Sequence, residues 1–255
     1  MFAEERRKSI VSILNERESI SVNELAKILN VSKTTIRSDL KYLEYKQVIN
    51  RTHGGATLIS SNRNDYKEVS YDLREKTNIE SKQEIAKKAY NLIEVNDTII
   101  LDSSSTCFEL ASLLKNSQKE ITVLTNGLKT ASLLRNNLCI TVIVIGGIIR
   151  KNSNAIESLL GVEIFNKINI DKVFFSSSGV SPESGFSDFN LYEIELKRKM
   201  LQVAKNKYAL IDSSKFDLIS SSNFANLNDV TMLITDKKID SKTFKKYSSH
   251  IKIMI

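Results

Sequence analysis

Several residue types are rare in this sequence, and each scarcity excludes a class of protein. The chain of 255 residues has two cysteines, two histidines, one proline and eight glycines. Cys107 and Cys139 stand far apart and form no cluster with His53 or His250, so neither a zinc site nor a disulfide framework is predicted. So little proline and glycine argues against long disordered stretches. We therefore expect a folded protein with no metal or other cofactor.

Long hydrophobic runs are also missing. The longest, CITVIVIGGII at residues 139–149, is shorter than the roughly 20 residues that span a bilayer. Residues 1–20 are charged and then amphipathic, and they lack the apolar stretch of a secretory signal. We expect a cytoplasmic protein with no membrane partner.

Positive charge is only slightly in excess. Lysine and arginine number 37 against 30 aspartates and glutamates, which gives a net charge of +7. The excess is spread along the chain, so a lysine-rich solvated surface explains it as well as a nucleic-acid partner does. The partner must therefore be inferred from the pattern of residues.

Residues 1–59 have the pattern of a small helical domain. Apolar residues recur at helical spacing in three consecutive stretches. Ser21 and Glu24 have the spacing of a capping box at the start of the second helix, and Ser32 is placed to cap the third. Only residues 29–31 separate these two helices, which predicts a helix-turn-helix.

The third predicted helix has two different sides. Ile36 and Leu40 mark a side that faces a core. The opposite side and its flanks carry Lys33, Thr34, Arg37, Ser38 and Lys41. Short hydroxyls there allow a close approach to base edges, and cations suit phosphates. A helical interaction module with a solvated polar side would show the same pattern, so the pattern alone leaves both interpretations open.

A hairpin is predicted after this helix. Residues 48–59, VINRTHGGATLI, have two short apolar runs around a turn at Gly54–Gly55. The hairpin would form a wing, with Arg51 and His53 beside its turn and placed to contact DNA.

The stretch VSKTTIRSDLKYLEYKQVINRTHGGA resembles the winged helix-turn-helix of the DeoR family of bacterial transcriptional regulators. The resemblance covers about residues 5–57 and implies double-stranded operator DNA as the partner. The residues that it implies for DNA contact are Ser32, Lys33, Thr34, Thr35, Arg37, Ser38, Lys41, Arg51 and His53. Where the family usually has two adjacent arginines, in TIRRDL, this chain has Arg37 and Ser38.

The rest of the chain has a different pattern. Residues 60–79 are polar with little periodicity and predict a linker, and residues 80–255 alternate apolar runs with helical stretches. The expected strands are residues 97–102, 121–126, 140–147, 172–179, 208–214 and 230–236. The expected helices are residues 81–93, 107–115, 128–136, 158–168 and 191–205. Continuous apolar strands between helices predict an α/β domain with a mostly parallel sheet.

The predicted strands end in polar residues, as in LDSSST, TNG, SSSGV and DSSK. Carboxyl ends of parallel strands meet at one edge, where open α/β sheets bind ligands, so we expect a pocket there. The run from Ser103 to Thr106 suits a phosphate at a helix N-terminus, although serine is also a common helix cap. Asp102 is a candidate for sugar hydroxyls or for capping, and Arg150 and Lys215 are candidate anchors or ordinary surface charges.

This half resembles the effector domain of the DeoR family over about residues 74–236, in SKQEIAKKA, DTIILDSSST, VLTNGL, IGGIIR, EIELKRKM and DSSKF. The resemblance implies a Rossmann-like fold related to ribose-5-phosphate isomerase and a phosphorylated sugar as effector. The implied effector-binding residues are Asp102, Ser103, Ser104, Ser105, Thr106, Thr125, Asn126, Gly146, Gly147, Arg150, Glu193 and Lys215. The family's DSGTT loop reads DSSST here, with Ser104 in place of the glycine.

Together these patterns predict a transcriptional regulator, a repressor of a sugar-metabolism operon whose DNA affinity a phosphorylated sugar controls. We expect a homo-oligomer, a dimer or tetramer, because paired recognition helices match operator half-sites. Two alternatives remain open. One is a sugar-phosphate isomerase in which Asp102, Glu193 or Asp212 acts as the base. The other is a constitutive DNA-binding protein with a vestigial pocket.

Overall fold

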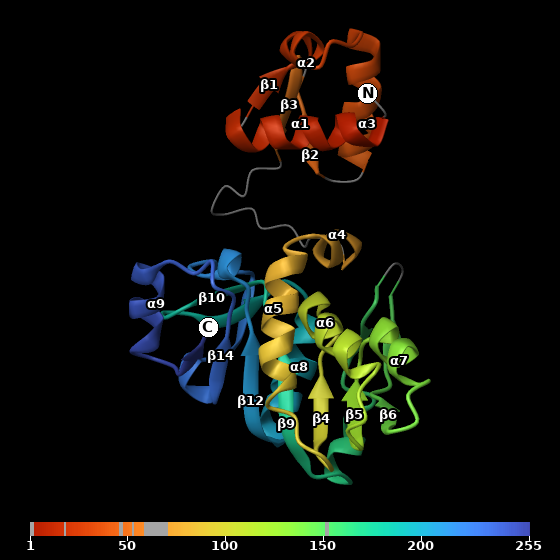
Figure 1. Ribbon diagram of the computed structural model, residues 1–255, viewed down its shortest axis with the longest axis vertical. Coiled ribbons are helices and arrows are strands. Elements are labelled where there is room, and N and C mark those ends of the chain that lie inside the picture. Colours follow the sequence, from red (N-terminus) through yellow and green to blue (C-terminus); the bar gives the residue numbers. More distant parts are fainter. Residues whose placement is uncertain (1–2, 18, 46–47, 53, 59–70, 151–152) are drawn as a thin grey trace. The chain divides into compact units, whose positions relative to one another are not determined.

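The computed structural model describes the chain except residues 1–2, 18, 46–47, 53, 59–70 and 151–152. It divides into two compact units, residues 1–66 and residues 67–255 (Figure 1). None of the described helices is both long enough and apolar enough to cross a membrane.

The first unit is a winged helix-turn-helix. Its elements are α1 (Ala3–Arg17), β1 (Ser19–Ser21), α2 (Val22–Ile28), α3 (Lys33–Tyr45), β2 (Ile49–Arg51) and β3 (Gly55–Leu58). The predicted hairpin is present as β2 and β3, and β1 adds a third antiparallel strand that the sequence analysis did not predict. Gly55 is required where β3 crosses β1, because a side chain there would collide with the carbonyl oxygen of Ile20.

The core and the caps of this unit follow the predicted pattern. Ile36 and Leu40 of α3 are fully buried with Leu25 of α2. The capping box is formed, since Ser21 accepts a hydrogen bond from the Glu24 amide and Glu24 accepts one from the Ser21 amide. These caps satisfy amides that the first turn of a helix leaves without partners.

One buried carboxylate ties α3 to α1. Asp39 accepts hydrogen bonds from Arg6 at 2.5 Å and from Arg7 at 2.8 Å, and only 2% of its side chain is exposed. The guanidinium of Arg7 also lies 3.7 Å from the centroid of the Tyr42 ring. These contacts fix the direction of α3 from the side that faces away from its polar surface.

The second unit is built on a seven-stranded sheet in which every neighbouring pair is parallel. Its strand order is β15-β14-β12-β9-β4-β5-β6. The strands are β4 (Thr98–Leu101), β5 (Ile121–Thr125), β6 (Ile140–Val144), β9 (Ile170–Phe175), β12 (Ala204–Leu210), β14 (Met232–Ile234) and β15 (Ile253–Met254). All six predicted strands are present, and β15 is an addition.

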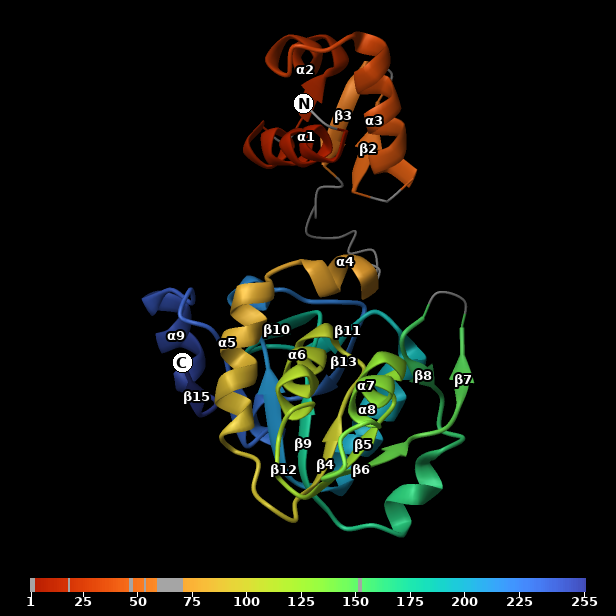
Figure 2. The same cartoon turned by 45° about the vertical axis from the view of Figure 1, so that its right-hand side comes forward.

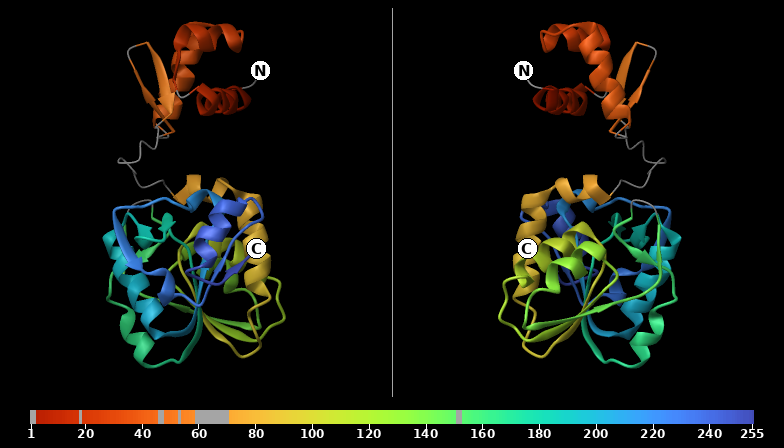
Figure 3. Two further views of the ribbon diagram at one scale, coloured as in Figure 1. Left: turned by 90° about the vertical axis from the view of Figure 1, so that its left-hand side faces the viewer. Right: turned by 90° about the vertical axis from the view of Figure 1, so that its right-hand side faces the viewer.

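Helices cover both faces of this sheet. The helices of this unit are α5 (Ile79–Tyr90), α6 (Ser105–Leu114), α7 (Leu128–Leu134), α8 (Leu191–Val203) and α9 (Ser241–Ser248), with α4 (Tyr71–Lys76) at the carboxyl edge of the sheet. Ile99 and Leu101 of β4 point into the core beneath α5, α6 and α7, and Ile100 points into the core beneath α8. The side views show the strands between these layers (Figure 3). The α/β prediction with a mostly parallel sheet is confirmed.

Smaller elements complete this unit. A second sheet joins β10 (Gly179–Ser181), β11 (Gly185–Asp188) and β13 (Ser222–Ala225), and β7 (Ile148–Ile149) pairs with β8 (Ile156–Glu157). Short 3-10 helices are η1 (Val162–Asn166), η2 (Ser213–Lys215) and η3 (Leu227–Asp229). The helix predicted over residues 158–168 is therefore only the short η1.

The linker predicted over residues 60–79 is too long. Residues 59–70 lie outside the described part, but Tyr71–Lys76 form α4, and α5 already begins at Ile79. Helix α4 packs against α6 and is held by a hydrogen bond of 2.6 Å from Lys129 to Glu75. Its six residues contain a single buried apolar anchor, Tyr71, so no periodicity revealed it.

Replacing Asp39 with alanine is expected to lower the stability of the first unit by about 2 kcal/mol, because Arg6 and Arg7 lose the carboxylate that compensates their partial burial. Native-state hydrogen exchange of the α1 and α3 amides measures this free energy. The exposed pair of Glu44 and Arg51 supplies the control, since Glu44→Ala should change stability by no more than about 0.5 kcal/mol. Equal protection in the two variants would contradict the role given to Asp39.

Candidate functional site

The first candidate surface is the outward side of α3. Lys33, Thr34, Arg37, Ser38 and Lys41 are all exposed there. In the described part of the chain, none of the three cations of this group forms an ion pair with a carboxylate. Cations at the N-terminal half of an exposed helix can reach phosphates while the neighbouring hydroxyls approach base edges.

The remaining residues predicted to contact DNA differ in how far their side chains are already engaged within the protein. Ser32 caps α3, accepting a hydrogen bond of 3.1 Å from the Thr35 amide, and the two hydroxyls lie 2.8 Å apart. Both hydroxyls are therefore used inside the turn. Arg51 of β2 forms an exposed ion pair with Glu44 at 3.3 Å, an interaction weak enough to exchange for a phosphate. His53 lies outside the described residues.

The second candidate site is the carboxyl edge of the large sheet. Figure 1 shows the arrowheads of β4 and β5 pointing toward α4. At this edge Asp102, Ser103, Ser104, Ser105 and Thr106 follow β4, and all five are buried. Ser104 caps α6 by accepting from the Cys107 amide at 3.2 Å. The serine run therefore begins a helix, as predicted.

Asp102 holds this edge together. Its carboxylate accepts hydrogen bonds from the amides of Ser104 and Ser176, both at 3.0 Å, and lies 3.2 Å from the Lys197 ammonium. Burial raises the pKa of Asp102, but the Lys197 charge and these amides outweigh burial and hold the pKa below its usual range. Asp102 is thus an ionised carboxylate with its acceptors occupied, which suits an organising role better than that of a base.

The two lysines of this edge differ in how many of their ammonium hydrogen-bond donors remain unused. Lys197 Nζ contacts Asp188 at 2.6 Å, the Ser176 carbonyl at 2.7 Å and Asp102, so its three donors are used. Lys215 Nζ donates to the Ser176 hydroxyl at 3.0 Å and stands 3.7 Å from Asp212. Burial lowers the pKa of Lys215. An ammonium has three donors, so Lys215 can still bind an anion.

Helix α4 adds groups that the sequence analysis did not identify. Tyr71 and Arg74 belong to α4, and Lys82 of α5 donates to the carbonyls of Arg74 and Thr77, the latter at 2.7 Å. Burial and the neighbouring Lys215 lower the pKa of Lys82 to about 8. Lys82 lies within SKQEIAKKA, the stretch that resembled the effector domain, but the polarity of residues 60–79 masked the α4 residues.

Several buried polar atoms near this edge have no hydrogen-bond partner among the described residues. They are the Tyr71 hydroxyl, Arg74 Nε, Thr106 Oγ1 and Asn126 Oδ1. Buried polar groups are rarely left unpaired, so each such atom calls for water or a ligand. Three donors or hydroxyls and one carbonyl oxygen, together with the Lys215 ammonium, suit an anion that also carries hydroxyl groups.

Thr125 and Asn126 follow β5. Thr125 accepts a hydrogen bond from the Gly127 amide at 3.0 Å. The Asn126 amide donates to the Ile156 carbonyl at 3.0 Å, which fixes its orientation and leaves its oxygen unpartnered. Of these two predicted residues, Asn126 is the one with capacity for a ligand.

The other predicted effector residues are used in contacts within the protein; we call Gly146, Gly147, Arg150 and Glu193 the effector rim. A side chain at Gly147 would collide with the Glu157 carbonyl, so this glycine has a packing reason, and Gly146 is exposed beside it. Arg150 donates to Glu157 at 2.6 and 3.1 Å. Glu193 accepts from Asn190 at 3.1 Å, and burial raises its pKa.

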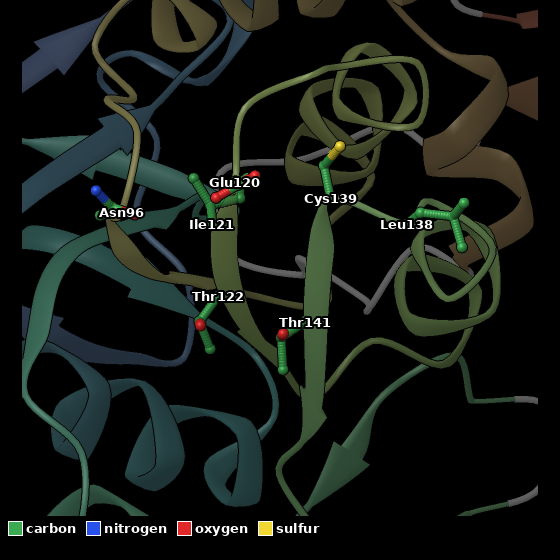
Figure 4. A pocket seen from close by; sticks show the side chains of 7 residues that line it. All are labelled: Asn96, Glu120, Ile121, Thr122, Leu138, Cys139 and Thr141. Atoms are coloured by element: carbon green, nitrogen blue, oxygen red, sulfur yellow. The ribbon is translucent and has the colours of Figure 1, made fainter.

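A separate cavity lies at the opposite edge of the sheet (Figure 4). It has a volume of about 370 Å³ near the amino ends of β5 and β6. Its lining residues are Asn96, Glu120, Ile121, Thr122, Leu138, Cys139 and Thr141. With one carboxylate and no cation in the lining, this cavity is poorly suited to an anion. No group of three or more metal-ligating side chains occurs within the described residues.

Both units match known protein families. Residues 6–62 match the DeoR-like helix-turn-helix domain, and residues 77–237 match the DeoR C terminal sensor domain. Among solved structures, the chain is similar to a D-ribose-5-phosphate isomerase in complex with phospho-erythronic acid, with a TM-score of 0.41 and 17% identity over 54% of each chain.

Curated relatives match over nearly the whole chain. The HTH-type transcriptional regulator GolR of Listeria innocua is 41% identical over 97% of this chain and 96% of its own. The lactose phosphotransferase system repressor of Staphylococcus epidermidis is 32% identical over 98% of each chain. The HTH-type transcriptional repressor GlcR of Bacillus subtilis is 34% identical over 93% of this chain and 90% of its own.

These relatives are named as transcriptional regulators or repressors. With both of its units matched in sequence order, the chain belongs to the DeoR family of DNA-binding transcriptional regulators.

Proposed function

We propose that this regulator represses a sugar-metabolism operon and that a phosphorylated sugar, bound at the carboxyl edge of the large sheet, controls its affinity for the operator. The observation that carries the proposal is the set of unsatisfied groups at this edge. Lys215 keeps free donors, and Tyr71, Arg74, Thr106 and Asn126 present atoms without partners. Such a set matches a phosphate joined to a polyol better than an apolar ligand.

The positions of the cations support placing the phosphate at one part of the edge. The positive charges of Arg74, Lys82 and Lys215 lie close together. The charge of Lys215 contributes to lowering the pKa of Lys82, and the charge of Arg74 contributes to lowering the pKa of Lys215. Asp212, 3.7 Å from Lys215, compensates part of this positive charge, and like charges in a buried site remain unfavourable unless they are fully compensated. A phosphate dianion would relieve this repulsion, and the hydroxyls of the sugar would extend toward Asn126.

The isomerase alternative finds less support. Asp102 is committed to Lys197 and two amides, and Asp212 accepts hydrogen bonds from Asn78 at 3.1 Å and from Ser214. Glu193 accepts a hydrogen bond from Asn190 at 3.1 Å, and burial raises its pKa, which disfavours the ionised form that a base needs. A catalytic base needs a carboxylate that is free to reach a substrate proton.

In DNA recognition, the outward residues of α3 would meet the operator, in a dimer or tetramer that pairs two such helices. A screen of sugar phosphates for stabilisation of the protein against heat tests the effector class.

Replacing Lys215 with alanine should weaken binding of a stabilising sugar phosphate by about tenfold or more, because a charge-assisted hydrogen bond is lost. Titration calorimetry measures the affinity. The control is Lys205→Ala, since Lys205 forms an exposed pair with Asp171 away from this edge. Operator binding without effector should be the same in both variants, and equal effector affinity in both would remove Lys215 from the site.

Replacing Arg37 with alanine should weaken operator binding and reduce the slope of log affinity against log salt by about one, as expected for one lost phosphate contact. Fluorescence anisotropy with labelled operator at several salt concentrations measures both quantities. Lys87→Ala removes the same charge from α5 and should leave the slope unchanged. An unaltered slope in Arg37→Ala would show that this side chain does not contact a phosphate.

Affinity for the sugar phosphate should fall as the pH rises through about 8. Lys82 has a lowered pKa of about 8, so its charge is largely present below this pH and is lost above it. The phosphate stays a dianion over this range, since its second pKa is about 6. Calorimetry between about pH 7 and 9.5 should show the fall, and Lys82→Gln should bind more weakly with a flatter profile. If the affinity of Lys82→Gln fell with pH in parallel with that of the native chain, a group other than Lys82 would be responsible for the pH dependence.

A further inference from the structure

Large apolar side chains gather on one part of the second unit. The members are Val144, Ile148, Ile149, Leu159, Leu160, Leu191 and Tyr192, each at least 40% exposed. We call this set the hairpin surface, because the β7–β8 hairpin lies at its centre. Single exposed apolar residues are ordinary, but a contiguous group of them marks a site of interaction.

The members are neighbours in space as well as in sequence. In the hairpin, Ile148 pairs with Glu157 and Ile149 with Ile156. The backbone at Gly161 packs on that at Gly146, which brings the residues after β8 beside the end of β6. The guanidinium of Arg150 lies 5.7 Å from the Tyr192 ring, which connects the hairpin to the start of α8.

Strand β7 is uncovered on both of its faces. Successive side chains of a strand point to opposite faces, yet Ile148 is 50% exposed and Ile149 is 56% exposed. Figure 2 shows β7 at the outer margin of this unit, beside β8. In the described residues β7 pairs only with β8, so its other edge is free. Proteins usually limit pairing at such an edge with charge, proline, a covering element or a very short strand. Strand β7 is short and Arg150 follows it, but its two isoleucines leave the strand itself apolar and exposed.

We propose that the hairpin surface is where a second copy of this chain docks. The inference rests on the proposed function, which requires paired recognition helices. In a two-fold contact the surface meets itself, so any uncompensated charge on it would be repelled. The one charge described beside these apolar members, that of Arg150, is compensated by Glu157. Two copies of a chain with a net charge of +7 repel each other, so a surface without uncompensated positive charge is suited to their contact.

The free edge of β7 gives the contact a defined form. Two copies of β7 related by a two-fold axis run antiparallel, so their backbones can pair across the axis while the isoleucines cover one another. The contact would also adjoin the effector site. Asn190 donates to Glu157 of the hairpin at 2.9 Å and to Glu193 at 3.1 Å, so one set of hydrogen bonds reaches from the hairpin to the effector rim.

Sedimentation velocity of the full chain, with neither DNA nor sugar phosphate present, tests this surface. The native chain is expected to self-associate, and Ile149→Asp and Leu160→Asp are each expected to raise the dissociation constant by about tenfold or more, because a buried charge replaces an apolar contact. Val95→Asp is the matched control, since Val95 is 57% exposed in the turn before β4 and lies outside the hairpin surface. It should sediment like the native chain.

A native chain that stays monomeric at about 100 µM would overturn the proposal, since obligate pairing needs tighter association. Native self-association that survives both aspartate variants would place the contact elsewhere. If a variant misfolds, hydrogen exchange of the native chain decides instead. The β7 amides should exchange more slowly at high than at low protein concentration, and unchanged exchange would contradict the contact. Because DNA and effector are absent, a failure of the operator or effector proposals leaves this result unaffected.

Discussion

The arrangement of the second unit depends on the buried ammonium of Lys197. A charge inside a protein is tolerated only when opposite charges and hydrogen bonds compensate it, and removing one partner costs several kcal/mol. Lys197 meets Asp102 at the end of β4, Asp188 at the end of β11 and the carbonyl of Ser176 after β9. Each element must therefore end at a particular place for the charge to be satisfied.

That constraint positions the groups of the proposed effector site. Asp102 in turn binds the amides of Ser104 and Ser176, which sets where α6 begins and where the chain leaves β9. Ser176 then presents its hydroxyl to Lys215. The ion pairs use the hydrogen-bonding capacity of Asp102 and Lys197, whereas Lys215 keeps donors for the proposed ligand. Because α4 is the first described helix after residues 59–70, an effector that binds Arg74 would act on the chain next to the segment between the two units.

Much of this could be predicted from the sequence, for physical reasons that can be named. Ile36 and Leu40 predicted which side of α3 faces the core, because a helix buries residues spaced three to four apart. The apolar runs gave six strands, because strands covered on both faces admit few polar residues. The polar residues after those strands led us to expect a ligand site at the carboxyl edge, where several buried polar atoms have no hydrogen-bond partner among the described residues.

The rest depends on contacts that sequence does not encode locally. Helix α4 is fixed by Lys82 and Lys129 from other helices, so its own six residues carry too weak a pattern to predict it. Arg150 was expected to be either an anchor for the ligand or an ordinary surface charge, and the structure shows it bound to Glu157 across the hairpin. Asp102 resembled a ligand-binding carboxylate, and only its distance to Lys197, a residue about a hundred positions away, revealed an organising role.

The central claim is that a phosphorylated sugar at the carboxyl edge changes the affinity of the protein for its operator. The most direct measurement is operator affinity by fluorescence anisotropy, with each of a panel of sugar phosphates and with its unphosphorylated parent. The account predicts that at least one sugar phosphate changes operator affinity by about tenfold, a coupling free energy of about 1.4 kcal/mol, while its parent has no effect. Operator affinity that is the same with every member of the panel would contradict it.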